Sequence, residues 1–222
     1  MNKTLKIGHR GAAGYEPENT LVSFQKAIEM GVDGIELDVH LSNDGKIMVI
    51  HDETIDRTTN VKGMVNELSC AELKKYGIPT LLQVLELVNR NCFVNIELKG
   101  NGTTKPVIEL IESFVLEKNW KYNQFLISSF VWKMLEEVQT LNPKIRLGVL
   151  TEDSILEAIA FAKSKKAFSI HPNYVLLTKK NTALMQENGF QVYPWTVNEI
   201  QEISRMKSFG VNGIISDFTD RI

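Results

Sequence analysis

The chain has 222 residues, of which 43% are hydrophobic and 23% are charged. These proportions are typical of a soluble globular protein and exclude a disordered chain, which lacks the apolar residues needed to build a core. The net charge is −2 at pH 7, so the overall charge gives no basis for nucleic-acid binding, although a local basic pocket is compatible with it.

The first residues and the cysteine content indicate an intracellular protein. Residues 1–6 lack the apolar core of a signal peptide, and no apolar run approaches the roughly 18 residues of a membrane span. Only Cys70 and Cys92 could form a disulfide, and so few cysteines are typical of a reduced compartment. We therefore expect a cytoplasmic protein without stable membrane insertion, while its oligomeric state is left open.

Short apolar runs alternate with segments of helical spacing along the chain. Leu21, Phe24 and Ile28, for example, fall on one face of a predicted helix. The expected strands are residues 5–9, 34–40, 93–99, 125–128, 145–150, 167–171, 191–195 and 213–217. Strands that alternate with helices predict a parallel sheet, and eight such units predict a TIM (β/α)8 barrel formed by residues 1–222 as a single domain.

Two segments depart from a plain barrel. The turn residues 43–45 are followed by a short apolar run at 47–50, which predicts a strand that returns antiparallel to the second strand. Residues 53–79 are long and weakly periodic, so we expect a small insertion there, after the second strand. The few residues that follow 213–217 leave no room for a full helix.

Charged residues alternate with apolar residues in two of the predicted strands. Glu36 and Asp38 lie on one side of the second strand, and Glu97 and Lys99 lie on one side of the third. In a barrel this side faces inward, near the strand ends where such enzymes have their active sites. Three carboxylates without a nearby cysteine favour Mg²⁺, Ca²⁺ or Mn²⁺, although an ion-pair network without metal has the same pattern.

Two histidines flank this acidic cluster. His9 ends the first strand, and the hairpin would carry His51 back over the carboxylates. Histidine exchanges protons near neutral pH, and Arg10 and Lys99 add the fixed positive charge that suits a phosphate. Although each histidine alone has an ordinary structural alternative, and Arg10 could simply pair with a carboxylate, the set predicts acid–base cleavage of a phosphate ester.

The ordered motifs resemble the glycerophosphodiester phosphodiesterase family. The segments that carry the resemblance are His9-Arg10-Gly11, Pro17-Glu18-Asn19-Thr20, Glu36-Leu37-Asp38-Val39, His51-Asp52, Arg57-Thr58-Thr59, Ile78-Pro79-Thr80-Leu81, Glu97-Leu98-Lys99 and Trp195-Thr196-Val197-Asn198. Each segment alone is weak evidence, but the ordered set is specific and extends from residue 7 to about residue 217. The resemblance implies a TIM barrel with a small insertion and hydrolysis of glycerophosphodiesters to sn-glycerol 3-phosphate and an alcohol.

The resemblance also implies roles for individual residues. One divalent metal ion, Mg²⁺ or Ca²⁺ with Mn²⁺ as a further possibility, would be held by Glu36, Asp38 and Glu97. His9 and His51 would be the general acid and base, in an order that the sequence leaves open. Arg10 and Lys99 would bind the phosphate, and Trp195 would form a wall of the glycerol pocket unless it serves only core packing.

Other polar residues near these motifs have more ordinary interpretations. Asn19 is expected to cap the helix that begins near Thr20, or to support the site together with Glu18. Asp52 is expected to serve the end of the hairpin, and His171 ends a strand without belonging to any motif.

Two alternative functions fit parts of the same pattern. One is a phospholipase D-like enzyme that acts on lysophospholipids, and the other is a barrel that binds phosphate without catalysis. The short insertion leaves the preference for the leaving alcohol open. For the glycerophosphodiester phosphodiesterase the expected partner is a small-molecule glycerophosphodiester, and for the phospholipase D-like enzyme it is a lysophospholipid. A nucleic acid is not expected in either case.

Overall fold

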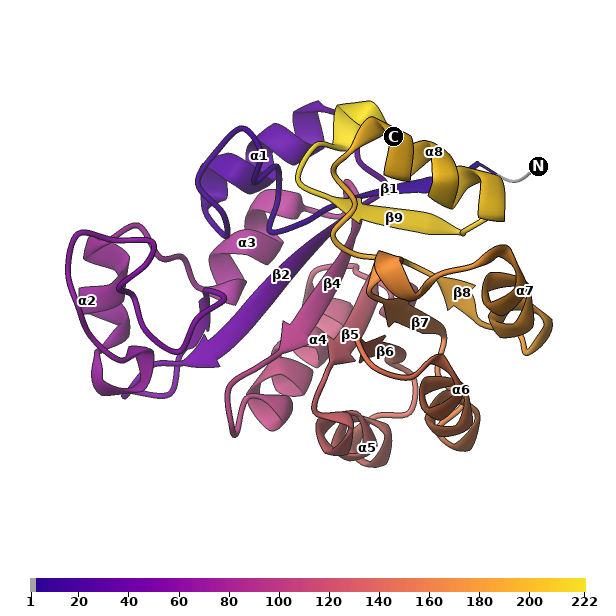
Figure 1. The fold of residues 1–222 in the computed structure, drawn as a ribbon. Coiled ribbons are helices and arrows are strands. Elements are labelled where there is room, and N and C mark those ends of the chain that lie inside the picture. The colour runs from indigo at the N-terminus through magenta and orange to yellow at the C-terminus, as the bar shows by residue number, and fades with distance from the viewer. Residues whose placement is uncertain (1–2) are drawn as a thin grey trace.

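Eight parallel strands form a nearly closed barrel with helices on its outside (Figure 1). The computed structural model describes residues 3–222. The barrel strands are β1 (Leu5–Gly8), β2 (Gly34–Leu41), β4 (Phe93–Leu98), β5 (Phe125–Ser129), β6 (Arg146–Thr151), β7 (Ser169–Pro172), β8 (Gln191–Val192) and β9 (Gly213–Ser216). Their order around the barrel is β8-β7-β6-β5-β4-β2-β1-β9, which confirms the predicted TIM barrel.

The outer layer consists of helices that connect successive strands. They are α1 (Leu21–Glu29), α3 (Leu81–Val88), α4 (Thr104–Glu117), α5 (Trp132–Leu141), α6 (Ile155–Ser164), α7 (Lys179–Glu187) and α8 (Ile200–Phe209). After β9, residues Thr219–Arg221 form a 3-10 helix. None of the helices within residues 3–222 combines the length and the apolar character needed to cross a membrane.

The barrel closes between β8 and β9 through irregular hydrogen bonds. The predicted strand 191–195 is longer than the observed β8, because Pro172 of β7 has no N–H to donate toward β8 and Pro194 has none to donate toward β9. The neighbouring Val192 N–H donates instead to the Asn212 side chain, at 2.9 Å. Three backbone hydrogen bonds still join the two segments: Asn212 N–H donates to the Val192 carbonyl (3.1 Å), Ile215 N–H donates to the Pro194 carbonyl (3.0 Å), and Val197 N–H donates to the Ile215 carbonyl (3.0 Å).

Strand β2 is longer than its neighbours and carries the hairpin beyond the barrel. Its last residues pair antiparallel with β3 (Ile47–Val49), as the sequence predicts. The following segment contains a 3-10 helix, Val65–Glu67, and the short helix α2 (Cys70–Lys75), and it forms a lobe at the side of the barrel (Figure 1). The lobe has its own small apolar core of Met48, Ile50, Ile55, Val65, Leu73 and Ile78.

The alternation along β2 separates the main core from the barrel interior. Ile35, Leu37 and Val39 are fully buried in the large apolar cluster between the strands and the helices. Cys92 is buried in the same cluster, and neither it nor Cys70 forms a disulfide. The intervening Glu36 and Asp38 must therefore point into the barrel, because side chains alternate along a strand.

A matched pair of leucines on α3 tests this assignment of the core. Leu85 is fully buried, whereas Leu82 is 44% exposed on the same helix. Leu85→Ala should lower the free energy of unfolding by about 2–5 kcal/mol, the usual cost of emptying a buried leucine site. Leu82→Ala should cost well under half as much in a urea titration. Equal losses in the two variants would contradict the packing described here.

Candidate active site

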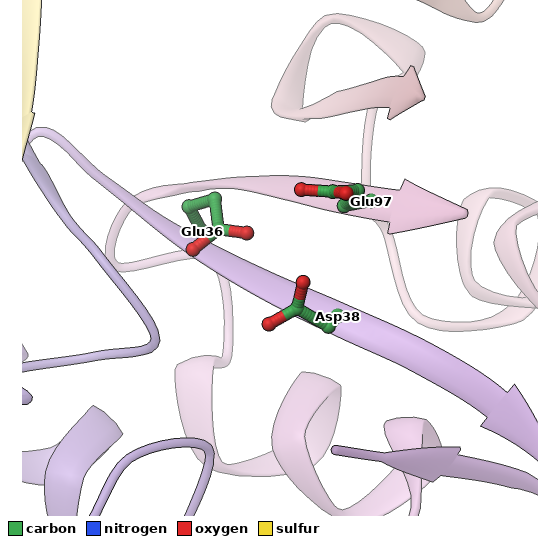
Figure 2. Close-up of side chains that lie close together, drawn as sticks. All are labelled: Glu36, Asp38 and Glu97. Atoms are coloured by element: carbon green, nitrogen blue, oxygen red, sulfur yellow. The ribbon is translucent and has the colours of Figure 1, made fainter. Parts of the chain in front are cut away.

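Three carboxylates converge inside the mouth of the barrel (Figure 2). Glu36 and Asp38 lie on β2, and Glu97 lies on β4 directly beside Asp38 in the strand register. All three residues are buried, and one oxygen from each lies within 4.8 Å of the other two. The sequence-predicted acidic residues are thus brought together at one point.

The acidic cluster is short of compensating positive charge. Burial is the main cause that raises the pKa of Glu36 well above its usual value, and the negative charges of Asp38 and Glu97 raise it further. Burial and the charge of Asp38 raise the pKa of Glu97 to about 7. Hard oxygen donors that repel one another in a buried place suit a divalent cation, so the donor set fits Mg²⁺, Ca²⁺ or Mn²⁺.

Lys99 and Arg10 partly neutralise the carboxylates. The Lys99 Nζ lies 3.2 Å from Glu97 Oε1 and 3.8 Å from Asp38 Oδ1. The Arg10 backbone N–H donates to Glu36 Oε2 at 3.0 Å, and its Nε lies 3.4 Å from Asp38 Oδ2. The ion pairs expected from the sequence are therefore present, but they do not offset the combined effect of burial and the charge of Asp38, which keep the pKa of Glu97 raised.

His9 and His51 line one pocket at the mouth of the barrel. Arg10, Lys99 and Trp195 line the same pocket, together with Glu36, Asn95, Glu97, Phe130, Leu150, Thr196 and Ile215. Of the residues predicted as a site, only Asp38 is absent from this wall, because it is buried behind it. The β2–β3 hairpin carries His51 back over the barrel, so residues from distant parts of the chain meet here.

Each histidine is paired with a carboxylate through its Nδ1 atom. His9 Nδ1 lies 2.6 Å from Asp217 Oδ1, and His51 Nδ1 lies 2.6 Å from Asp52 Oδ1. A carboxylate at Nδ1 orients the ring and favours the tautomer in which Nδ1 carries the proton. Each ring is then left with Nε2 as the atom that can exchange a proton with a substrate.

The environment of His51 favours its neutral form. Burial is the main cause that lowers the pKa of His51 below its usual value, against the opposing effect of nearby carboxylates. Lys99 Nζ lies 3.0 Å from His51 Nε2, and since an ammonium group can only donate, this nitrogen accepts. His51 is therefore arranged as a neutral ring with its proton on Nδ1.

Sequence reasoning did not assign Asp52, Asp217 or Asn198 to the site. Asp52 orients His51 in addition to ending the hairpin, and Asn198 Nδ2 donates to Asp217 Oδ2 at 2.6 Å. Asp52 and Asn198 belong to motifs of the family resemblance, which gave them no role, and Asp217 had only its position at the end of a predicted barrel strand. Asp217 lies 208 positions from His9 along the chain, and Asn198 acts on His9 only through Asp217, so no local pattern predicts these contacts.

Asn19 supports the carboxylates and does not cap the helix, so the capping expectation was wrong. Thr20 is the N-cap of α1, and its side chain accepts a hydrogen bond from Ser23 N. Asn19 adopts a left-handed backbone conformation, with φ of 58°, and its amide donates to Asp38 Oδ2 at 2.9 Å. A β-branched residue would be strained in this conformation, whereas asparagine tolerates it.

Trp195 forms part of the pocket wall, and His171 lies beneath it. The indole Nε1 donates to the His171 carbonyl at 2.8 Å, and the ring meets Phe130 edge to face with centroids 5.3 Å apart. His171 itself is fully buried and does not line the pocket. Burial lowers the pKa of His171 to about 3, so the ring is neutral and has a structural role.

Comparison with known proteins connects this site to a family. A family model described as the glycerophosphoryl diester phosphodiesterase family matches residues 9–221. The chain belongs to this family. It is 39% identical to a glycerophosphodiester phosphodiesterase of Caldanaerobacter subterraneus subsp. tengcongensis, over 97% of this chain and 94% of that protein. It is 40% identical to one of Bacillus altitudinis, over 98% of this chain and 96% of that protein.

A solved structure of a related enzyme has the same fold. A phosphodiesterase of Oleispira antarctica, in complex with the product sn-glycerol-3-phosphate, superposes with a TM-score of 0.84. The two chains are 26% identical, and the match covers 97% of this chain and 94% of the other. The family resemblance inferred from the motifs is thus confirmed.

Metal binding at the carboxylates can be measured without any substrate. Mg²⁺ or Ca²⁺ added to EDTA-treated protein should raise its melting temperature, because a ligand at 100 times its Kd stabilises the folded state by about 2.7 kcal/mol. Glu97→Gln should reduce this rise, and Glu109→Gln, an exposed glutamate on α4, should leave it intact. An equal rise in the wild type and in Glu97→Gln would exclude Glu97 as a ligand.

Proposed function

We propose that this protein hydrolyses glycerophosphodiesters to sn-glycerol 3-phosphate and an alcohol. The observation that carries the proposal is one pocket that combines two carboxylate-oriented histidines, two cations and a buried acidic cluster. This combination suits a phosphodiester, whose charge needs cations and whose cleavage needs an acid and a base. The activity named for its relatives and the product bound to the Oleispira enzyme support the same substrate class.

We propose that His9 and His51 exchange the protons of the reaction. One ring accepts, at its Nε2 atom, the proton of the attacking hydroxyl, which belongs to water or to the glycerol moiety of the substrate. In the second case a cyclic phosphate forms first, and water then opens it to give sn-glycerol 3-phosphate. The other donates a proton to the oxygen of the departing alcohol as the phosphorus–oxygen bond breaks. The proton gained by the first ring equals the proton lost by the second, so the pair returns to its starting state after proton exchange with water.

The remaining pocket residues bind and orient the substrate in this proposal. The Arg10 guanidinium and the Lys99 ammonium contact the phosphate oxygens, and Trp195 provides an apolar wall for the glycerol carbons. Glu36, Asp38 and Glu97 hold one divalent ion, Mg²⁺ or Ca²⁺, with Mn²⁺ as a further candidate. When bound, such an ion supplies positive charge next to the phosphate and favours negative charge on its oxygens.

We propose further that the enzyme is a single domain that acts on a small molecule in the cytoplasm. Residues 1–222 act as one catalytic domain, with residues 53–79 as a small insertion in it. The substrate is a small molecule and not a nucleic acid, and the reaction takes place in the cytoplasm without stable membrane insertion.

Product release from glycerophosphocholine tests the proposed reaction. The purified protein should release glycerol 3-phosphate and choline, EDTA should abolish the release, and Mg²⁺, Ca²⁺ or Mn²⁺ should restore it. Release from a lysophospholipid, with none from glycerophosphocholine, would instead favour the phospholipase D-like alternative. Phosphate binding without turnover of either substrate would favour a non-catalytic barrel.

Single replacements of the two histidines test the proposed proton transfer. His9→Ala and His51→Ala should each lower kcat by at least the ~10²-fold that is typical of lost acid–base catalysis. Both variants should keep a melting temperature close to that of the wild type, because each ring is partly exposed in the pocket. Near-normal turnover in both variants would refute the roles assigned to them.

A further inference from the structure

The geometry points to Arg57 as a positioning residue that holds Asp52 against His51 and ties the insertion to the barrel. This inference deepens the proposed function, on which it rests for the role of His51. It is based on a chain of contacts that runs from His51 through Asp52, Arg57 and Glu18 to Arg10.

The Arg57 guanidinium bridges two carboxylates. Its Nε donates to Asp52 Oδ2 at 2.7 Å, and its Nη2 lies 3.2 Å from Asp52 Oδ1. Its Nη1 and Nη2 also donate to the two oxygens of Glu18, at 2.8 and 2.7 Å. Every nitrogen of the side chain is thus engaged, in the planar two-pronged geometry that arginine provides and lysine does not.

Glu18 joins this bridge to the phosphate-binding side of the pocket. Its Oε1 also accepts a hydrogen bond from Arg10 Nη1 at 2.8 Å. Burial alone would raise the pKa of Glu18, but the hydrogen bonds and charges of Arg57 and Arg10 outweigh it and lower that pKa to about 2. Glu18 is therefore a permanent anion between two arginines, one from the insertion and one from the barrel.

Arg57 acts on the site through Asp52 and not by contact with substrate. It is absent from the wall of the pocket that contains His9 and His51, and it lines a neighbouring cavity with Pro17 and Tyr76. Its hydrogen bond is the largest cause that keeps the pKa of Asp52 well below its usual value, followed by the bond with His51. Without Arg57, the Asp52 side chain has no second anchor and can rotate away from the histidine.

The contribution of Arg57 to stability should be small. Its side chain is 49% exposed, and ion pairs at such solvent-accessible positions add little to the free energy of unfolding. Replacement of Arg57 should therefore disturb the orientation of His51 while the barrel stays folded. A loss of activity without a loss of stability would therefore distinguish a positioning role from a purely structural one.

A kinetic series tests the role of Arg57 in turnover. Arg57→Ala and Arg57→Lys should each lower kcat for glycerophosphocholine by about 10- to 100-fold, the scale of a misplaced catalytic group, with little change in KM. Arg205→Ala is the matched control, because Arg205 pairs with Glu202 on α8 and is absent from the pocket wall. Its kcat should be that of the wild type.

The double variant Asp52→Asn/Arg57→Ala identifies the path of the effect. If Arg57 acts through Asp52, the double variant should have a kcat less than about 3-fold below that of Asp52→Asn alone. The effects of residues that act as a unit are not additive in free energy. Losses that multiply would overturn the inference, as would a wild-type kcat in Arg57→Ala.

An NMR measurement separates this inference from the proposed function. The ¹⁵N signals of the His51 ring, assigned with His51→Ala, should indicate one tautomer with the proton on Nδ1 in the wild type. In Arg57→Ala they should shift toward a mixture of tautomers, while the melting temperature stays within a few degrees. If the wild type hydrolyses neither glycerophosphocholine nor a lysophospholipid and this shift still occurs, the proposed function fails and the positioning role stands. Unchanged ring signals would overturn the positioning role.

Discussion

The structure depends on the burial of three like charges at the mouth of the barrel. Glu36, Asp38 and Glu97 repel one another where water is largely excluded, and burial raises the pKa of both glutamates. Such an arrangement is costly to the folded state unless positive charge lies close by. The side chains of Lys99 and Arg10 supply it, and the Arg10 backbone N–H and the Asn19 amide add neutral hydrogen bonds to the carboxylates. The residues that would bind phosphate are therefore also the ones that make the acidic cluster tolerable.

The barrel provides what this cluster requires. Parallel strands with covered outer faces allow Ile35, Leu37 and Val39 to be buried outward while the alternate residues point inward. The register between β2 and β4 then places Asp38 beside Glu97. The extra length of β2 adds a second consequence, because its antiparallel return through β3 brings His51 back above the carboxylates. One long strand thus positions two acidic residues and one histidine.

Sequence reasoning succeeded where a local pattern is compatible with one structure. It failed where a side chain bonds to a residue far away in the sequence, and where the end of a strand or helix depends on individual hydrogen bonds. The strand alternation predicted the inward acidic residues, and the eight strand–helix units predicted the barrel. The contact between His9 and Asp217 spans 208 positions, and no periodicity reports it. Strand β8 ends early because Pro172 and Pro194 have no N–H to donate, and Thr20 occupies the capping position that was expected for Asn19. These outcomes depend on tertiary geometry, which composition and spacing do not contain.

The two histidines are supported by different parts of the molecule, and this asymmetry has consequences. His9 is oriented by Asp217 and, through it, by Asn198, both of which follow barrel strands. His51 is oriented by Asp52 and Arg57 from the insertion side, and only Glu18 connects that side to Arg10. A sequence change in the insertion can therefore alter the position of His51 and leave His9 where it is. The proton transfer assigned to His51 is thus open to adjustment by a surface segment, whereas that assigned to His9 is fixed by closure of the barrel.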